Sequence, residues 1–374
     1  MKITLDTATL TGELFKLLGI VSSKSTMPIL SNALLEADAD GTLSLHATDL
    51  DISVSTEVRA DVERPGRIAV RGRDLYDAVK NLRSPTVTLE KEDNLWVQLN
   101  AGTVRARLVG MDPADFPNLL RADDATFVTM GIGKLVRMID RTIFSVSTDE
   151  GRPNLTGALL KAEDGVLMMV STDGHRLSKV EVNVDLGATP SALLEGVIVP
   201  RKGLAELRRT VDLTDETLQI GILNSNVVFK HSNTTMFVRL IDGTFPVFRS
   251  VVPEEKDARK AVVDRAELMS RIKFVALFSS AKTHNLSLQL EDGTCTISAQ
   301  DADKGECLEQ IPVNYAGASV KAGYNYKYLV DVLSVVDTEQ VSVEIIDTLS
   351  PTIIHEIAGE PDERSLFIVM PMRL

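Results

Sequence analysis

The sequence predicts an α+β protein in which one domain pattern, two helices plus a set of antiparallel strands, occurs three times. The pattern returns at a period of about 125 residues, which is the length of a whole domain rather than of a solenoid repeat. Each repeat has the same order of elements: a helical stretch, a strand pair, a second helix and further strands. With 374 residues and 44% hydrophobic content, the chain can form a separate core in each repeat.

The first half of each repeat predicts a helix followed by a β-hairpin. A short acidic turn with a glycine joins two alternating runs at 37–42, 162–166 and 290–294, and Asp-Gly between such runs is a strong hairpin signal. The helical stretches that precede these hairpins are 14–25, 135–153 and 268–284.

The second half of each repeat predicts a strand that runs directly into a short helix. These segments are 68–82, 197–211 and 321–336, and further alternating strands follow each of them. Polar, acidic stretches near 118–127 and 250–260 separate the repeats, as linkers do. We therefore expect three domains, at 1–120, 128–250 and 258–374.

The chain as a whole is acidic, but its predicted helices are basic. The net charge is −13, which by itself argues against a nucleic-acid-binding protein. The predicted helices, however, carry about +11 and leave about −24 for the strands and loops. If the helices of every repeat share one face, that face attracts phosphate without reading base sequence, while the acidic remainder repels DNA.

Basic side chains on or beside these helices are the candidates for contact with DNA. For any single helix, an ordinary solvated face explains such residues better than contact with DNA does. Only the recurrence of basic helices in an acidic chain favours DNA. Three similar domains suggest a curved array, and closure by symmetric self-association leaves no exposed sheet edge. The candidate DNA-facing residues are Lys24, Arg73, Lys80, Arg137, Arg141, Arg201 and Lys202.

The sequence does not indicate an enzyme. Asp173 and His175 are the strongest catalytic candidates, but ATDLD in the first repeat corresponds to STDGH in the second, which favours a turn role. We find no P-loop, GxSxG, HExxH or GxGxxG pattern, and the histidines lack metal-ligand spacing. Cys295 and Cys307 form no CxxC and are expected to be buried thiols. We expect neither a metal nor a cofactor, and the alternative to a DNA-binding ring is a scaffold that binds peptides without DNA.

Four short segments carry a resemblance to a known family. They are TMPILSN at 26–32, STDGHRL at 171–177, DGTFPVF at 242–248 and IVMPMRL at 368–374. In this order, on three repeats and across the whole chain, they resemble the beta subunit of bacterial DNA polymerase III, the beta sliding clamp family. The resemblance implies a head-to-tail homodimer that forms a six-domain ring around duplex DNA, with helices lining the central hole and no catalytic activity.

The resemblance also implies the partners of the chain. A clamp loader driven by ATP places the ring on DNA, and partner proteins insert short, mostly apolar peptides into a pocket between the second and third domains. The expected partners are double-stranded DNA, a second copy of the chain, the replicative polymerase alpha subunit, the clamp loader, other polymerases, ligase and mismatch-repair proteins. We expect a cytoplasmic protein, because the sequence has no run of 18 apolar residues and begins with strand-like alternation instead of a signal peptide.

The resemblance places the peptide pocket on residues whose chemistry suits that role, since apolar side chains with several methionines form an adaptable lining. The predicted pocket comprises Leu155, Thr172, Gly174, His175, Arg176, Leu177, Pro246, Val251, Ile368, Met370, Pro371, Met372, Arg373 and Leu374. Simple packing on the sheet is the alternative for the apolar C-terminus. Ser250 departs from the arginine that well-known members carry at the rim, and Pro153 and Asn154 depart from aromatic residues near DNA.

Opposite charges mark a candidate dimer interface. The segment VRAR at 104–107 is basic, whereas DADKGECLE at 301–309 is acidic. These segments predict a contact between opposite ends of two chains, and two unrelated surface strands are the alternative. The candidate interface residues are Arg105, Arg107, Leu277, Phe278 and Glu306.

Overall fold

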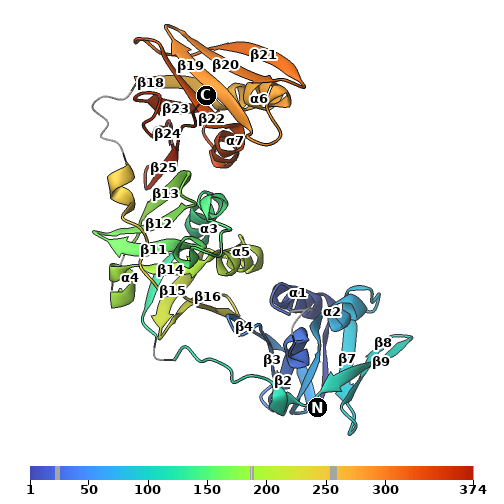
Figure 1. Cartoon of the computed structure of the whole chain (residues 1–374). Helices are drawn as coiled ribbons and strands as arrows, with labels where there is room; N and C mark the ends of the chain where they lie inside the picture. The colour runs from blue at the N-terminus through green and yellow to red at the C-terminus, as the bar shows by residue number, and fades with distance from the viewer. Residues whose placement is uncertain (22–25, 124, 186, 188, 253–258, 374) are drawn as a thin grey trace. The chain divides into compact units, whose positions relative to one another are not determined.

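A computed structural model describes the chain apart from residues 22–25, 124, 186, 188, 253–258 and 374 (Figure 1). The chain divides into two compact units. Unit 1 comprises Met1–Gly133, Gly187–Pro190 and Lys202–Leu240, and unit 2 comprises Lys134–Leu186, Ser191–Arg201 and Ile241–Leu374.

The described part of unit 1 contains one antiparallel sheet of thirteen strands, in the order β10-β15-β16-β17-β4-β3-β2-β6-β9-β8-β7-β1-β5. The strands are β1 (Lys2–Asp6), β2 (Asn32–Ala37), β3 (Thr42–Thr48), β4 (Ile52–Arg59), β5 (Asp61–Arg64), β6 (Gly66–Arg71), β7 (Thr86–Lys91), β8 (Trp96–Ala101), β9 (Val104–Met111), β10 (Phe127–Gly131), β15 (Thr217–Leu223), β16 (Asn226–His231) and β17 (Thr234–Arg239). The helices are α1 (Thr7–Leu17), α2 (Gly72–Lys80) and α5 (Arg201–Thr210).

Helices α1 and α2 pack side by side in the first repeat (Figure 1). The carboxylate of Asp6 accepts a hydrogen bond from the backbone N–H of Thr9 at 2.8 Å and thereby caps the start of α1. Leucines of α1 and α2, among them Leu14 and Leu75, are buried at the helical spacing that the sequence predicts. The exposed face of α2 carries Arg73, Asp74, Asp77 and Lys80, whereas α1 exposes Phe15 and pairs its half-buried Lys16 with Glu13.

Unit 2 contains an eight-stranded sheet, in the order β14-β11-β12-β13-β25-β24-β23-β18, and a four-stranded sheet, in the order β21-β20-β19-β22, within its described residues. The strands are β11 (Gly157–Glu163), β12 (Val166–Thr172), β13 (Arg176–Asn183), β14 (Val197–Pro200), β18 (Arg259–Asp264), β19 (Asn285–Glu291), β20 (Thr294–Asp301), β21 (Gly305–Pro312), β22 (Val320–Asn325), β23 (Gln340–Ile345), β24 (Thr352–Glu356) and β25 (Glu363–Val369). The helices are α3 (Ile132–Asp140), α4 (Ser191–Glu195), α6 (Arg265–Val275) and α7 (Tyr326–Val335).

The three predicted hairpins are present as β2–β3, β11–β12 and β19–β20. In the second of these turns, Asp164 and Gly165 both have positive φ, at 51° and 80°. Two consecutive positive φ angles are what a tight hairpin turn requires, and Asp-Gly supplies them at little cost. In the other two turns only the glycine has a positive φ, 88° at Gly41 and 70° at Gly293, so the glycine of the Asp-Gly pair is the feature common to all three turns.

Neighbouring repeats are joined by strand pairing, which the sequence pattern does not predict. Strand β4 of the first repeat pairs with β17 of the second in unit 1. Strand β13 of the second repeat pairs with β25 of the third in unit 2, in a register that places Leu177 opposite Ile368. Each of these sheets thus contains strands from two neighbouring repeats. The domain boundaries at 1–120, 128–250 and 258–374 therefore stay a prediction. Among the described helices, none combines the length and the apolar character that a membrane crossing requires.

Candidate functional site

The residues of the predicted pocket lie together in unit 2, around the end of β12, the strands β13 and β25, and the segment 242–252. Its floor is apolar, because Leu155, Leu177 and Ile368 are buried. The half-buried members are Thr172, Arg176, Met370, Pro371 and Met372, and the exposed ones are Gly174, His175, Pro246, Val251 and Arg373. Leu374 lies outside the described residues.

The polar edge of this pocket is a tight turn between β12 and β13. The hydroxyl of Thr172 donates to the carbonyl of Arg176 at 2.6 Å and accepts from the N–H of Gly174 at 3.1 Å. One carboxylate oxygen of Asp173 accepts from the N–H groups of His175 and Arg176, at 2.9 and 3.1 Å. Gly174 has a φ of 91°, which a side chain would strain. Asp173 therefore supports the turn, in agreement with the turn role that the sequence favours.

Arg176 is tied to its surroundings and is not a free charge at the rim. Its guanidinium donates to Asp173 at 3.0 Å, to Asp331 of α7 at 2.5 Å and to the carbonyl of Phe144 at 2.5 Å. It also lies 4.5 Å from the ring centroid of Tyr328 and 5.2 Å from that of Phe144. Two carboxylates compensate its charge, so we assign Arg176 to positioning the edge of the pocket. The sequence reasoning missed Asp331 and Tyr328, whose helix gave no sign of contact with the second repeat.

The C-terminal residues are held in place by backbone hydrogen bonds. The N–H of Met370 donates to the carbonyl of His175 at 2.9 Å, and the N–H of Met372 donates to the carbonyl of Gly323 at 2.7 Å. The imidazole of His175 in turn stacks on Tyr328 with ring centroids 6.4 Å apart. The tail is thus anchored at the pocket up to Met372, unlike a frayed terminus.

Ser250 adds no charge at the rim of the pocket. Its hydroxyl donates to the carbonyl of Val247 at 2.9 Å and closes the short 3₁₀ turn Phe248–Val251. Beside it, 42% of Val251 is exposed, which leaves an apolar side chain available to a ligand. Pro153 begins another 3₁₀ turn, Pro153–Leu155, and Asn154 donates to the carbonyl of Thr244 at 3.1 Å.

Four of the candidate DNA-facing residues are exposed at the two second helices of unit 1 and its boundary. Arg73 and Lys80 lie on α2, and Arg201 and Lys202 begin α5. Lys202 forms an ion pair with Asp49, which partly offsets its charge. These side chains are able to reach solvent, as contact with phosphate requires.

The prediction that Arg141 faces DNA is wrong. Only 4% of this residue is exposed, because its guanidinium is buried among acidic side chains. It pairs with Glu356 at 2.8 Å, with Asp337 at 3.1 Å and with Glu363. Arg137 is half-buried and pairs with the same Glu363 at 2.8 Å, so its charge is also largely used inside the protein. Lys24 lies outside the described residues.

Three of the candidate dimer residues, Arg105, Arg107 and Glu306, lie on strands β9 and β21, and Leu277 and Phe278 lie in the 3₁₀ turn Ala276–Phe278. Residues 104–109 of β9 pair only with β8 among the described strands, and β21 is the last strand of its sheet. Arg105 and Glu306 are exposed on these edges, and Arg107 pairs with Glu92 and stacks on Trp96 at 4.7 Å. The apolar side chains exposed at or near these edges are Val109 at 62%, Leu277 at 64% and Leu308 at 63%, whereas Phe278 is half-buried.

The prediction of two buried thiols is confirmed for Cys295 and is wrong for Cys307, which is half-buried on β21. Burial raises the pKa of the Cys295 thiol to about 12, which disfavours the reactive thiolate. Cys295 and Cys307 are both free thiols. Within the described residues, no group of His, Cys, Asp and Glu side chains is arranged to hold a metal ion.

Comparison with known proteins covers the chain from end to end. Three family models match in order: the DNA polymerase III beta subunit N-terminal domain at residues 1–120, the central domain at 130–247 and the C-terminal domain at 249–373. The beta sliding clamp of Pseudomonas aeruginosa is 34% identical over 95% of both chains, and that of Escherichia coli K12 is 33% identical over the whole of both chains.

Solved structures agree with the sequence matches. The beta sliding clamp of Caulobacter crescentus has 31% sequence identity and a TM-score of 0.91, with 100% of this chain and 99% of that chain covered. That crystal structure is described as having PEG bound in a proposed beta-motif tethering region. The three matched domains, the fold and the relatives lead to one conclusion: the chain belongs to the family of DNA polymerase III beta subunits, the beta sliding clamps.

Proposed function

We propose that two copies of the chain join head to tail into a ring that encircles duplex DNA and holds the replicative polymerase on its template. As a member of the sliding clamp family, the chain is a processivity factor and not an enzyme. The observation that carries the ring is the pair of free strand edges, β9 and β21, which bear opposite charges.

The two edges complement each other in hydrogen bonding, apolar contact and charge. A free strand edge presents unpaired N–H and C=O groups and invites pairing with another chain. Val109 on β9 and Leu308 on β21 are exposed, and burying them between chains removes apolar surface from water. Arg105 faces solvent on the first edge and Glu306 on the second, so unlike edges attract and like edges repel. A head-to-tail arrangement of two copies uses both edges of each copy and closes.

The basic helices support a DNA-facing role for Arg73, Lys80, Arg201 and Lys202. Contacts from these side chains to phosphates hold duplex DNA without a preference for sequence. We propose domains at 1–120, 128–250 and 258–374, each with two helices available for such contacts. Arg137 and Arg141 take no part in our proposal, because carboxylates within the protein engage them.

The pocket around Leu177 and Ile368 supports binding of partner peptides. An apolar floor, an exposed Val251 and adaptable methionines suit a site that accepts several related sequences. We propose that the replicative polymerase alpha subunit, the clamp loader, other polymerases, ligase and mismatch-repair proteins bind there in the cytoplasm. The PEG molecule at the tethering region of the Caulobacter crescentus clamp supports the presence of an accessible groove in this family.

The test of the ring is the double variant Arg105→Glu and Arg107→Glu. We expect the wild-type chain to sediment as a dimer of about twice 40.8 kDa and the variant to sediment as a monomer, because two basic charges on the edge become acidic. Wild-type protein loaded by a clamp loader is expected to stay on circular DNA and to leave linearised DNA. The control Arg64→Glu reverses an exposed arginine on β5 and should leave the dimer intact. A dimer that survives the double reversal contradicts the β9–β21 assignment, and equal retention on circular and linear DNA contradicts the ring.

A further inference from the structure

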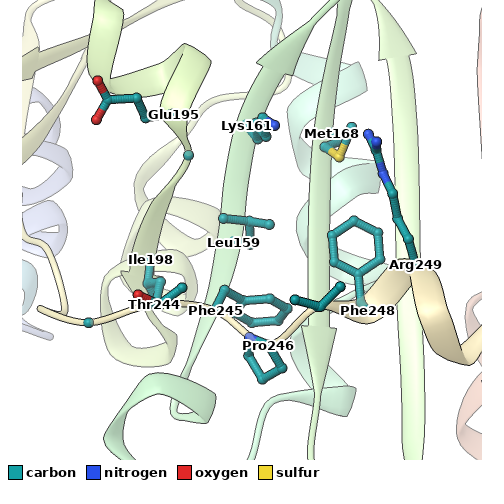
Figure 2. A pocket seen from close by; sticks show the side chains of 13 residues that line it. Leu159, Lys161, Met168, Glu195, Ile198, Thr244, Phe245, Pro246, Phe248 and Arg249 are labelled. Carbon is teal, nitrogen blue, oxygen red and sulfur yellow. The ribbon is translucent and has the colours of Figure 1, made fainter.

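A second groove lies beside the segment that borders the predicted pocket. The loop residues 243–249 form one wall, and β11, β12 and the end of α4 form the other (Figure 2). The groove has a volume of about 390 Å³. Pro246 lines this groove and is also a member of the predicted pocket, so the two sites share one residue.

The floor of the groove continues the apolar floor of the pocket. Leu159, Met168 and Phe245 are buried beneath it, and Phe248 is half-buried beside them with its ring 6.4 Å from that of Phe245 (Figure 2). The buried cluster that contains these side chains also contains Leu177 and Ile368 of the predicted pocket. A peptide that leaves the pocket across Pro246 therefore stays on apolar surface.

Apolar side chains at or next to the lining of the groove are exposed to solvent. Val247 is 79% exposed, and Leu194 on α4 is 49% exposed next to Glu195, which lines the groove. Val247 follows Pro246 directly and precedes the 3₁₀ turn that ends at Val251, so two exposed apolar side chains flank the segment shared by the groove and the predicted pocket. Exposed apolar residues gathered around a groove are typical of a binding surface.

The charges around the groove specify the kind of ligand. Glu163 pairs with Lys161 at 3.6 Å and with Arg249, so both cations of the rim are already engaged. Glu195 lies across the groove from Arg249 and is exposed, and it forms no ion pair or hydrogen bond with the residues that the structure describes (Figure 2). Glu195 is therefore the one charged side chain of this rim without an ion-pair partner among the described residues, and a cationic ligand group beside it would supply that partner.

We propose that this groove binds the flank of a partner peptide whose apolar anchor occupies the predicted pocket. The flank is an extended segment with an apolar side chain over Leu159, Met168 and Phe248 and a lysine or arginine beside Glu195. This inference rests on the proposed function, because it assumes that partner peptides occupy the pocket. It adds a second specificity determinant that distinguishes among peptides with the same anchor.

The experiment selects ligands from a displayed library of random peptides of about 16 residues on the full-length wild-type chain and on the variant Glu195→Lys. Both selections are expected to return the same apolar anchor. Peptides selected on the wild-type chain should carry lysine or arginine in the flank, and those selected on the variant should carry aspartate or glutamate there, because the charge at the end of the groove is reversed.

Synthetic peptides from the wild-type selection then give the magnitudes by fluorescence anisotropy. Glu195→Lys should weaken a peptide with a basic flank about threefold, the size of an exposed ion pair. Val247→Asp should weaken it about tenfold through lost apolar contact. Neither variant should change the binding of a peptide trimmed to its anchor. Glu216→Lys and Leu213→Asp, exposed in unit 1, are the matched controls and should change nothing.

The outcomes separate the groove from the pocket. If the flank shows no charge preference on either protein and Glu195→Lys binds the long peptide as the wild type does, the groove proposal is wrong while the pocket stands. If Val247→Asp weakens trimmed and long peptides equally, residue 247 acts through the pocket, and the groove proposal is again wrong. If no anchor is selected and Val251→Asp has no effect, the pocket itself is overturned.

Discussion

Arg141 and Glu363 form an ion pair in which both side chains are buried, with 5% and 2% of their areas exposed. Arg141 follows α3 in the second repeat, and Glu363 begins β25 in the third repeat. This ion pair links the second and third repeats, in addition to the backbone hydrogen bonds between β13 and β25. A buried charge costs several kcal/mol in desolvation unless partners compensate it, and here Arg141 has three carboxylate partners while Glu363 has two arginines.

Replacing Arg141 should destabilise unit 2 strongly. Arg141→Met removes the cation, leaves Glu356 without an ion-pair partner among the described residues and leaves Glu363 with Arg137 alone, at an expected cost of about 3–5 kcal/mol in the free energy of unfolding. Urea denaturation followed by circular dichroism measures this loss. Arg249→Met, which breaks an exposed ion pair with Glu163, is the matched control and should cost less than about 1 kcal/mol. If the two variants lose the same free energy of unfolding, the buried ion pair stabilises the protein no more than the exposed one does.

The stability of the chain should fall on mild acidification. Burial lowers the pKa of His46 and, with the nearby Lys16 cation, of His231 below the usual value for histidine. Between those lowered values and about 6.5, the unfolded chain binds more protons than the folded chain, so the free energy of unfolding decreases as the pH decreases.

This pH dependence can be assigned by substitution. His46 contacts Ser55 and lies beside Glu36 and Arg67, while Asp215 faces His231. Replacing both buried histidines with glutamine should flatten the dependence between about pH 7 and about pH 5.5. The exposed His175→Gln variant should retain the wild-type slope in the same urea titrations. An unchanged slope in the double variant would assign the effect to other groups.

DNA affinity should depend on salt through exposed helix cations. Each phosphate contact that is lost, as in Arg73→Ala or Lys202→Ala, should reduce the slope of log K against log salt by about 0.9. Electrophoretic mobility shift or anisotropy titrations at several salt concentrations measure that slope. Because Arg141 is buried, Arg141→Met should leave the slope unchanged wherever the protein is folded. A reduced slope for this variant would restore Arg141 to the DNA-facing set.

The peptide pocket should lose its ligand when Val251 becomes charged. Val251→Asp places a carboxylate on the apolar rim and should weaken a peptide from the replicative polymerase alpha subunit by about 2 kcal/mol, or about thirtyfold. Isothermal titration calorimetry with the full-length chain measures the change. Leu213→Asp, an exposed apolar residue of unit 1, controls for the added charge. If Val251→Asp binds the peptide with wild-type affinity, Val251 does not belong to the pocket.

Local patterns in the sequence predict the elements of each repeat well, because their causes are local. The Asp-Gly turns produce positive φ angles at 164 and 165, and leucine spacing buries one side of α1 and α2. The turn role of Asp173 was also predictable, since the same pattern stands in the first repeat. The family resemblance, in turn, predicted the three-domain clamp fold that the comparisons show.

Relations between distant segments were not predictable from the same patterns. Helical spacing separates Arg141 from the apolar face of α3, but it does not show that carboxylates more than 190 residues later surround the guanidinium. Likewise, the basic character of 104–107 does not reveal that Arg107 already stacks on Trp96 and pairs with Glu92. Charge counted along a sequence includes cations that the folded protein neutralises internally.

The pairing of β13 with β25 places main-chain hydrogen bonds where two repeats meet. Hydrogen bonds between N–H and C=O groups are indifferent to the side chains attached to them. The connection between the second and third repeats therefore does not constrain which side chains face outward from it. Surface residues of this seam are free to diverge toward new binding partners while the mechanical continuity of the chain is preserved.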